Sequence, residues 1–199
     1  MTSPRSRPAS PKTPKARAVG APKAAASKPS PVPAATPKPS PASGALVAGA
    51  RAPAFALASG DGAEVALADF AGKWLVVYFY PKDSTPGCTR EACDFEAKRA
   101  ALAKSGAAVV GVSRDSVASH ARFGANQGLG FPLLSDPDAA VHRAWGAYGE
   151  KTMYGKKVVG ALRTTVLVDP KGKVARVWQP VKVDGHADAV LAALGELRG

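Results

Sequence analysis

Residues 74–80 (WLVVYFY) are seven consecutive apolar or aromatic residues, with no charge among them. A continuous apolar run of this length predicts a strand buried on both faces, whereas a half-exposed strand alternates. A second such strand is expected at 107–113, and the segment between them, 88–105, predicts a helix that stops at Gly106. A sheet that buries such strands must be covered by other elements on both of its sides.

Shorter signals extend the pattern along the chain. They predict strands at 54–57 and 64–67 around a Ser-Gly-Asp-Gly turn, a helix at 116–127, a short helix from Asp136-Pro137 to Trp145, a hairpin of 164–169 with 174–179, and a closing helix at 186–197. Strands that alternate with helices and end in a hairpin and a helix predict a mixed α/β sandwich.

The amino-terminal segment has a different composition. Residues 1–44 contain 11 of the 18 prolines and eight of the 27 Lys and Arg residues, but no Asp, Glu or aromatic residue. Such a segment cannot bury enough apolar surface to order itself, so residues 1–45 are predicted to be a disordered Pro/Ala/Lys-rich tail and 46–199 the folded domain. No apolar run of about 18 residues predicts a transmembrane helix, and no apolar stretch near the start predicts a secretory signal.

The tail leaves several interpretations open. Its Ser-Pro-Arg, Ser-Pro-Lys and Thr-Pro-Lys triplets resemble those of linker-histone-like tails, and its cations could bind nucleic-acid phosphates weakly and salt-dependently. A solubilising or mistranslated leader is the plainer reading. An organellar transit peptide is a lesser option, because the segment is acid-free but unusually rich in Pro.

The chain has only two cysteines, Cys88 and Cys93. A structural zinc site usually takes four Cys or His ligands in short pairs, and the thioredoxin motif spaces its cysteines C-x-x-C, so neither pattern fits. Two inert core cysteines are the alternative. The position of Cys88 favours reactivity, because it lies where a helix begins after a buried strand. The free N–H groups and the dipole at a helix N-terminus stabilise a thiolate.

The five-residue spacing of the cysteines also carries a mechanical consequence. Two residues at i and i+5 of an ideal helix lie roughly 8.6 Å apart between Cα atoms, and their side chains diverge by about 140°. A disulfide needs Cα atoms closer than about 7 Å. If Cys88 and Cys93 react with each other, the first turns of this helix must therefore unwind.

The segment 78–95 resembles the active-site segment of peroxiredoxins, and most closely that of the peroxiredoxin Q branch, or bacterioferritin comigratory protein type. Pro81, Thr85 and Cys88 match the motif P-x-x-x-[TS]-x-x-C, and Cys93 matches the resolving cysteine of that branch. Downstream, residues 154–157 and 160–165 resemble the segment that carries the active-site arginine, here Arg163. The resemblance covers residues 46–198 and implies a thioredoxin-like fold.

The resemblance also implies an antioxidant chemistry. The Cys88 thiolate would reduce hydrogen peroxide and organic hydroperoxides and become a sulfenic acid, with Thr85 and Arg163 binding the peroxide and Pro81 shielding the sulfur. Cys93 would then form an intramolecular disulfide that thioredoxin or a similar dithiol reduces. Sulfur alone does this chemistry, so no cofactor or metal is expected. A cytoplasmic monomer with no membrane association is expected.

Two further expectations concern residues outside the motif. The histidines, His120, His142 and His186, are expected to be surface or capping residues, and the three tryptophans to belong to the core or an interface. The rival function is a nucleic-acid-associated redox protein whose domain senses or binds rather than turns over.

Overall fold

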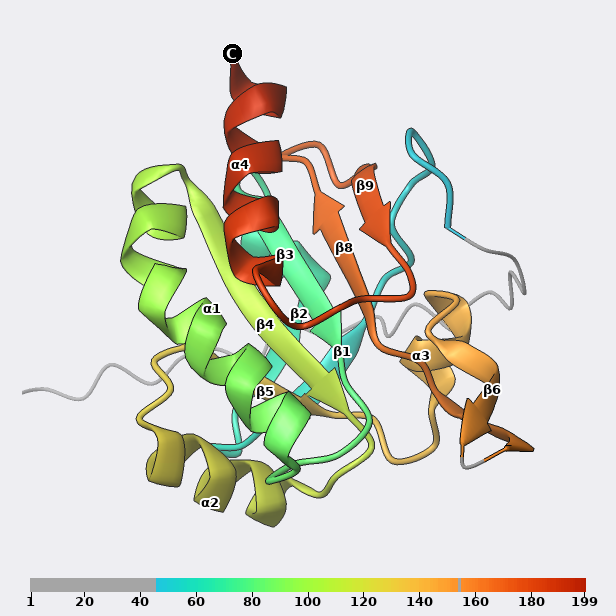
Figure 1. Ribbon diagram of the computed structural model, residues 1–199. Helices are drawn as coiled ribbons and strands as arrows, with labels where there is room; N and C mark the ends of the chain where they lie inside the picture. Colours follow the sequence, from blue (N-terminus) through green and yellow to red (C-terminus); the bar gives the residue numbers. More distant parts are fainter. Residues whose placement is uncertain (1–45, 154) are drawn as a thin grey trace, which may run out of the picture. The chain divides into compact units, whose positions relative to one another are not determined.

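The predicted buried strand, β3 (Trp74–Phe79), lies inside a seven-stranded sheet of the computed structural model, which describes residues 46–153 and 155–199. The strand order is β2-β1-β5-β4-β3-β8-β9 (Figure 1). β3 pairs in parallel with β4 (Ala107–Ser113) and antiparallel with β8 (Thr164–Val168). The sheet is therefore mixed, as the sequence predicts. The predicted tail of residues 1–45 lies outside the described residues, as does Tyr154.

The remaining strands of this sheet are short. They are β1 (Ala56–Ser59), β2 (Glu64–Ala66), β5 (Leu133–Ser135) and β9 (Val174–Trp178). β1 begins two residues later than the predicted strand at 54–57, and β5 was not predicted. β5 has three residues, which is too few for a periodic signal, and it is held in place by pairing with β4 and β1.

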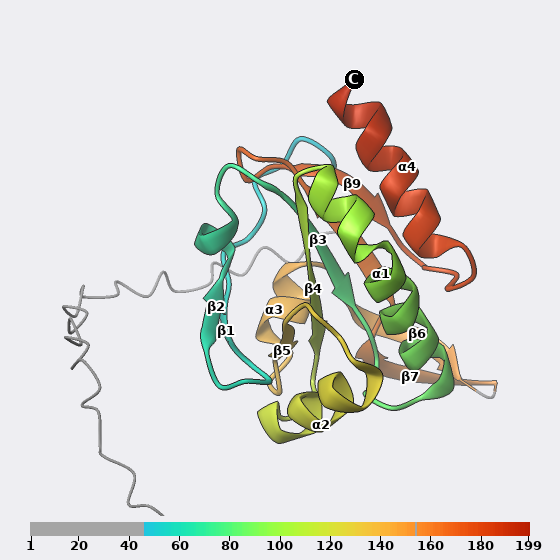
Figure 2. The ribbon, with the colours of Figure 1, turned by 90° about the vertical axis from the view of Figure 1, so that its left-hand side faces the viewer.

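Alternate residues of β3 enter two different cores. On one face, Val76, Tyr78 and also Tyr80, just past the end of the strand, pack with side chains of α1 (Pro86–Lys104), α2 (Val117–Gln127) and α4 (His186–Arg198). Figure 2 shows α1 and α4 side by side over this face of the sheet. The Tyr78 ring stacks on Tyr80 and Phe95, with ring centroids 5.3 and 4.9 Å away. The beginning of α1 packs on this core through Cys88 and Ala92.

The opposite face of β3 carries Leu75, Val77 and Phe79, which pack with Trp145 and Phe55. A 3₁₀ turn, η1 (Leu67–Phe70), and α3 (Ala140–Ala144) complete the described elements around this core. α3 begins at Ala140 rather than at the predicted Asp136-Pro137. The Asp136 carboxylate instead accepts hydrogen bonds from the backbone N–H groups of Ala140 and His142, so it fixes a turn ahead of the helix.

A second, two-stranded sheet was not predicted. β6 (Tyr148–Met153) and β7 (Lys156–Ala161) form an antiparallel hairpin with Gly155 at its turn. Most of β7 is exposed, so its sequence lacks the buried face that makes a strand recognisable. The hairpin leads directly into the residues that precede β8.

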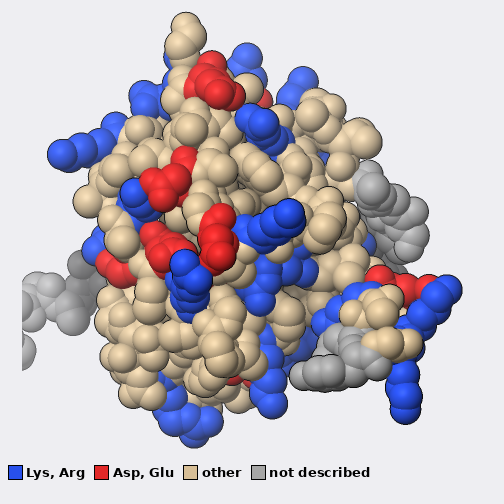
Figure 3. All heavy atoms as spheres, viewed as in Figure 1, with Lys and Arg blue, Asp and Glu red and all other residues tan. Residues whose placement is uncertain are grey.

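The surface over α1 and α4 mixes both charge signs (Figure 3). Arg90 of α1 forms an ion pair of 2.8 Å with Asp184, and Lys98 pairs with Asp188 of α4. These pairs are largely exposed and are worth about 1 kcal/mol or less each. Within the described ranges, no helix combines the length and the apolar character needed to cross a membrane.

The expectation that the histidines lie at the surface is wrong. His120, His142 and His186 are all buried, with exposed fractions of 5% or less. In each histidine, one ring nitrogen pairs with a polar side chain, that of Asp83, Asp136 and Thr165 respectively. The expectation for the tryptophans is confirmed: Trp145 is buried, and Trp74 and Trp178 pack against the core.

Candidate active site

Cys88 lies in the first turn of α1, and its side chain is buried. Thr85 is the N-cap in extended conformation and Pro86 is the first helical residue. Proline is tolerated there because the N–H it lacks would have no intrahelical partner. The backbone N–H groups of the first turn, at the positive end of the helix, are therefore close to the cysteine. The helix begins two residues earlier than predicted, which places Cys88 inside its first turn.

Arg163, 75 residues after Cys88 in the sequence, lies beside this sulfur. Its Nη2 atom lies 3.2 Å from Cys88 Sγ. The sheet explains this approach: β8 runs antiparallel to β3, so Thr164 at the start of β8 pairs with Phe79 at the end of β3. Arg163 therefore emerges beside the loop that leads into α1. A fixed cation at this distance favours a thiolate and can donate hydrogen bonds to an oxygen bound beside it.

Glu91 is a site residue that sequence reasoning missed. Glu91 belongs to the buried face of α1, and its carboxylate forms an ion pair with Nη1 of Arg163. Burial, partly offset by Arg163, raises the pKa of Glu91 to about 7. Burial lowers the pKa of Arg163, but Glu91 and Cys88 outweigh it and raise the value. The spacing gave a signal: a residue three positions after Cys88 shares its helix face, and that face is otherwise apolar.

Thr85 and Pro81 belong to the loop of residues 81–85, which joins β3 to α1. Pro81 is half-buried, and Ser84 adopts a left-handed conformation with φ 59°. The Thr85 hydroxyl donates to the carbonyl oxygen of Lys82, 3.1 Å away. Thr85 thus lies one turn before Cys88, with its hydroxyl turned into the loop.

Cys93 lies two turns into α1 and is exposed, and both thiols are free. Its sulfur is 3.6 Å from Oε1 of Gln127, at the end of α2. Both cysteines are helical, as the sequence predicts, so the separation of roughly 8.6 Å between their Cα atoms holds in this form. One cysteine is enclosed in the site and the other faces outward.

His186, the first residue of α4, lies close enough to Arg163 to be influenced by its charge. Its Nε2 lies 2.7 Å from the Thr165 hydroxyl, and its ring meets Phe95 edge-on with centroids 5.7 Å apart. Burial, with a smaller contribution from Arg163, lowers the pKa of His186 to about 4. The ring is therefore neutral at physiological pH.

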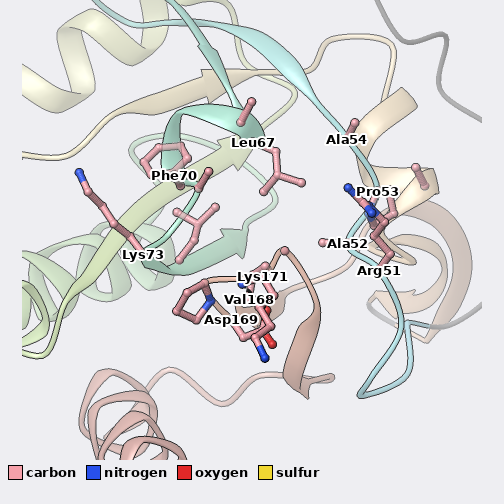
Figure 4. A pocket seen from close by; sticks show the side chains of 16 residues that line it. Arg51, Ala52, Pro53, Ala54, Leu67, Phe70, Lys73, Val168, Asp169 and Lys171 are labelled. Carbon is pink, nitrogen blue, oxygen red and sulfur yellow. Dashed lines mark hydrogen bonds between the residues drawn. The ribbon is translucent and has the colours of Figure 1, made fainter.

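A cavity of about 680 Å³ lies away from this site (Figure 4). Its walls include Leu67, Phe70 and Val168, with Arg51 and Lys73 near its edges. It opens near the start of β3, whereas Cys88 follows the end of that strand. None of the five predicted site residues lines it, so this cavity is not the site of the cysteine chemistry.

Here the inner strand of a mixed sheet leads into a helix with an enclosed cysteine, and an arginine faces that cysteine. This arrangement defines a thiol-dependent peroxidase with a thioredoxin-like fold. The comparisons agree with this class. Residues 48–177 match the AhpC/TSA family. Peroxiredoxin Bcp of Xanthomonas campestris is 56% identical over 138 residues, which cover 69% of this chain and 86% of the relative. Peroxiredoxin Bcp of Escherichia coli is 42% identical over 151 residues, covering 76% and 97%.

The chain belongs to the AhpC/TSA family and, within it, to the peroxiredoxins of the Bcp or Q type. A solved structure of the Xanthomonas campestris bacterioferritin comigratory protein superposes with a TM-score of 0.70 at 52% identity, covering 73% of this chain and 92% of that one. That structure concerns alkyl peroxide reduction and trapped intermediates. The chain is thus an enzyme that acts on peroxides with a thiol reductant.

Proposed function

We propose that Cys88 is the residue that attacks the peroxide and that the substrates are hydrogen peroxide and organic hydroperoxides. The thiolate sulfur bonds to one peroxide oxygen, the O–O bond breaks, and the departing oxygen leaves as water or an alcohol after taking up a proton. Cys88 becomes a sulfenic acid. The 3.2 Å contact between Arg163 Nη2 and Cys88 Sγ supports this role above all others. It supplies positive charge to the thiolate and to the oxygen on which charge develops.

Thr85 and Pro81 serve the same step in this proposal. The Thr85 hydroxyl, one turn ahead of the sulfur, donates a hydrogen bond to the bound peroxide after giving up its bond to the Lys82 carbonyl. Pro81 shapes the loop and limits access of water to the sulfur. A Thr85→Val variant should slow the oxidation of Cys88 on the order of tenfold or more, and Thr85→Ser should restore it, because only the hydroxyl is required.

Cys93 is proposed as the resolving residue. Its thiol condenses with the Cys88 sulfenic acid, water leaves, and the Cys88–Cys93 disulfide forms. Thioredoxin or a similar dithiol then reduces this disulfide. The exposure of Cys93 supports the proposal, since the reductant must reach one sulfur of the pair.

A coupled assay with thioredoxin, thioredoxin reductase, NADPH and peroxide tests both assignments. Wild-type protein should oxidise NADPH in a peroxide-dependent manner, and Cys88→Ser should not. Cys93→Ser should complete one turnover and then stall or overoxidise. A wild-type rate no greater than that of Cys88→Ser would exclude the peroxidase, and sustained wild-type turnover by Cys93→Ser would exclude the resolving role.

The cellular setting is also a proposal. A disulfide that forms and is reduced in each cycle suits the cytoplasm, where thiols are kept reduced. We expect the enzyme to act there as a monomer. Light scattering during size-exclusion chromatography should give the mass of a single chain.

The basic amino-terminal segment supports one secondary proposal, that it holds the peroxidase near nucleic acid. Residues 1–44 carry eight cations and no acid. Binding to duplex DNA should be weak and should fall steeply with salt. Deletion of residues 1–44 should abolish retention on DNA at low salt without changing peroxidase activity. Unchanged retention would reject this proposal. The rival, in which the domain only senses or binds, is tested by the coupled peroxide assay described above.

A further inference from the structure

Asp83, in the middle of the 81–85 loop, is a buried carboxylate with three donors around it. The Tyr80 hydroxyl donates to Oδ1 at 2.7 Å, and the Ser119 hydroxyl donates to Oδ2 at 2.8 Å. His120 Nδ1 lies 2.9 Å from Oδ2. Burial raises the pKa of Asp83, but the hydrogen bonds from these donors outweigh burial and lower it. The carboxylate is therefore ionised and tied to α2, which carries Ser119 and His120.

His120 faces hydrogen-bond acceptors on both sides of its ring. Nδ1 faces the Asp83 carboxylate, and Nε2 lies 3.2 Å from the carbonyl oxygen of Leu134 in β5. A ring N–H can donate to either acceptor, and the Tyr80 hydroxyl also lies 3.4 Å from Nδ1. Through its buried ring, His120 therefore connects the 81–85 loop to α2 and to β5.

The backbone of Asp83 is held as well. Its N–H donates to Oδ2 of Asp115 at 2.9 Å, and Asp115 accepts a second bond from the Ser113 hydroxyl at 2.7 Å. The loop is thus fastened to the end of β4 and to the beginning of α2. Thr85 lies two residues after Asp83, and Cys88 lies five residues after it. The direction in which α1 starts therefore depends on this attachment.

We infer that Asp83 and His120 are positioning residues for the peroxide step. They hold the 81–85 loop against α2, so that Thr85 and the first-turn N–H groups of α1 stay aimed at the Cys88 sulfur. The inference rests on the proposed function of Cys88. It assigns the pair to the oxidation of Cys88 and not to the later reaction with Cys93, because the disulfide forms only after the first turns of α1 have left this arrangement.

The chain offers a matched control for this pair. Asp136 and His142 form a second buried Asp–His pair, with Oδ2 and Nδ1 2.7 Å apart. They lie in and before α3. Within the described ranges they make no hydrogen bond to the 81–85 loop. Removal of either pair should cost similar stability, but only the first should affect the chemistry.

The test compares Asp83→Asn and His120→Gln with Asp136→Asn and His142→Gln. Stopped-flow fluorescence after mixing with hydrogen peroxide would give two rates. The oxidation of Cys88 is read in a Cys93→Ser background and disulfide formation with Cys93 present. Asp83→Asn and His120→Gln should each slow the oxidation of Cys88 about tenfold, as for the loss of one hydrogen bond to a charged group. Each should leave the rate of disulfide formation within about twofold of the wild-type rate. The double variant Asp83→Asn/His120→Gln should be no slower than either single one.

Three results would overturn the inference. In the first, Asp83→Asn and His120→Gln fold and their Cys88 is oxidised at the wild-type rate. In the second, the control variants slow oxidation equally. In the third, disulfide formation slows as much as oxidation. If Asp83→Asn does not fold, Ser119→Ala removes one donor from the same carboxylate and should slow oxidation about threefold. A wild-type protein that oxidises no faster than Cys88→Ser is a separate result, which rejects the proposed function itself.

Discussion

The buried carboxylate of Glu91 holds the guanidinium group of Arg163, whose other terminal nitrogen contacts the sulfur of Cys88 at 3.2 Å. Glu91 and Cys88 share one face of α1, and Arg163 comes from the short segment between β7 and β8, which is distant from α1 in sequence. The planar guanidinium can serve both partners at once because its donors point in fixed directions.

Replacement of Arg163 should therefore impair the peroxide step even when the charge is kept. Lysine has a single ammonium group, which cannot contact Glu91 and Cys88 simultaneously with the same geometry. Arg163→Lys should slow Cys88 oxidation about tenfold and Arg163→Ala about a hundredfold, as expected for lost hydrogen bonds to charged groups. Single-turnover oxidation by hydrogen peroxide measures this. Arg176→Lys, at an exposed ion pair, should react at the wild-type rate; an equal loss there would contradict the assignment.

Glu91 and His186 should make opposite contributions to stability in mild acid. The pKa of Glu91 is raised from 4.5 to about 7 on folding, so its contribution is present below about pH 4.5 and is lost as the pH rises to about 7. The pKa of His186 is lowered from 6.5 to about 4, so its contribution is present above about pH 6.5 and is lost as the pH falls to about 4. Where these pH ranges overlap, the two contributions to the free energy of unfolding should largely cancel.

Single variants should reveal the separate contributions of Glu91 and His186 to the free energy of unfolding. Between about pH 5 and pH 6.5, the unfolding free energy of Glu91→Gln should rise by about 2 kcal/mol relative to wild type, and that of His186→Gln should fall by a similar amount. Urea unfolding of the reduced protein at the two pH values gives both differences. Glu64→Gln, at an exposed site, should follow wild type. Parallel pH profiles for all four proteins would show that neither group is perturbed.

Gly111 in β4 should not tolerate alanine. A Cβ at this position would lie 2.7 Å from the Tyr78 hydroxyl and 2.8 Å from Leu133 Cδ2. Gly111→Ala should therefore cost about 1–3 kcal/mol of unfolding free energy by overpacking. Gly124→Ala in α2 is the matched change, with no heavy atom within 4 Å of the added carbon, and should gain about 0.5–1 kcal/mol. Thermal and urea unfolding measure both; equal effects would refute the packing argument.

Oxidation should unwind the start of α1. Bonding between Cys88 and Cys93 requires Cα atoms within about 7 Å, whereas the helix holds them roughly 8.6 Å apart. Amide hydrogen exchange in residues 89–93 should therefore become faster in the oxidised wild type. Peroxide-treated Cys93→Ser should keep its protection. A mapped Cys88–Cys93 disulfide in a protein with unchanged protection would contradict the prediction.

The regular elements were predictable where burial is continuous along the chain. β3 and β4 have apolar runs that identify them, and α1 has a loop before it and Gly106 after it. The hairpin of β6 and β7 was not predictable, because β7 is largely exposed and neither strand carries a buried alternation. The buried state of His120, His142 and His186 also escaped prediction. The partners of His120 and His186 reach them only in the assembled fold, and the burial of His142 depends on the packing of α3 against the sheet.

The sequence by itself determined which atoms can react: two cysteines five residues apart, the first at the start of a helix, within a motif that includes Pro81 and Thr85. It also determined that these two cysteines cannot bond while the helix is intact, because helix geometry depends only on local dihedral angles. Only the tertiary structure decided what surrounds Cys88. The antiparallel pairing of β8 with β3 brings Arg163 to the sulfur, and the packing of α1 buries Glu91 against it. Contacts of this kind join residues some 70 positions apart, and their energies arise from burial and geometry that no local pattern contains.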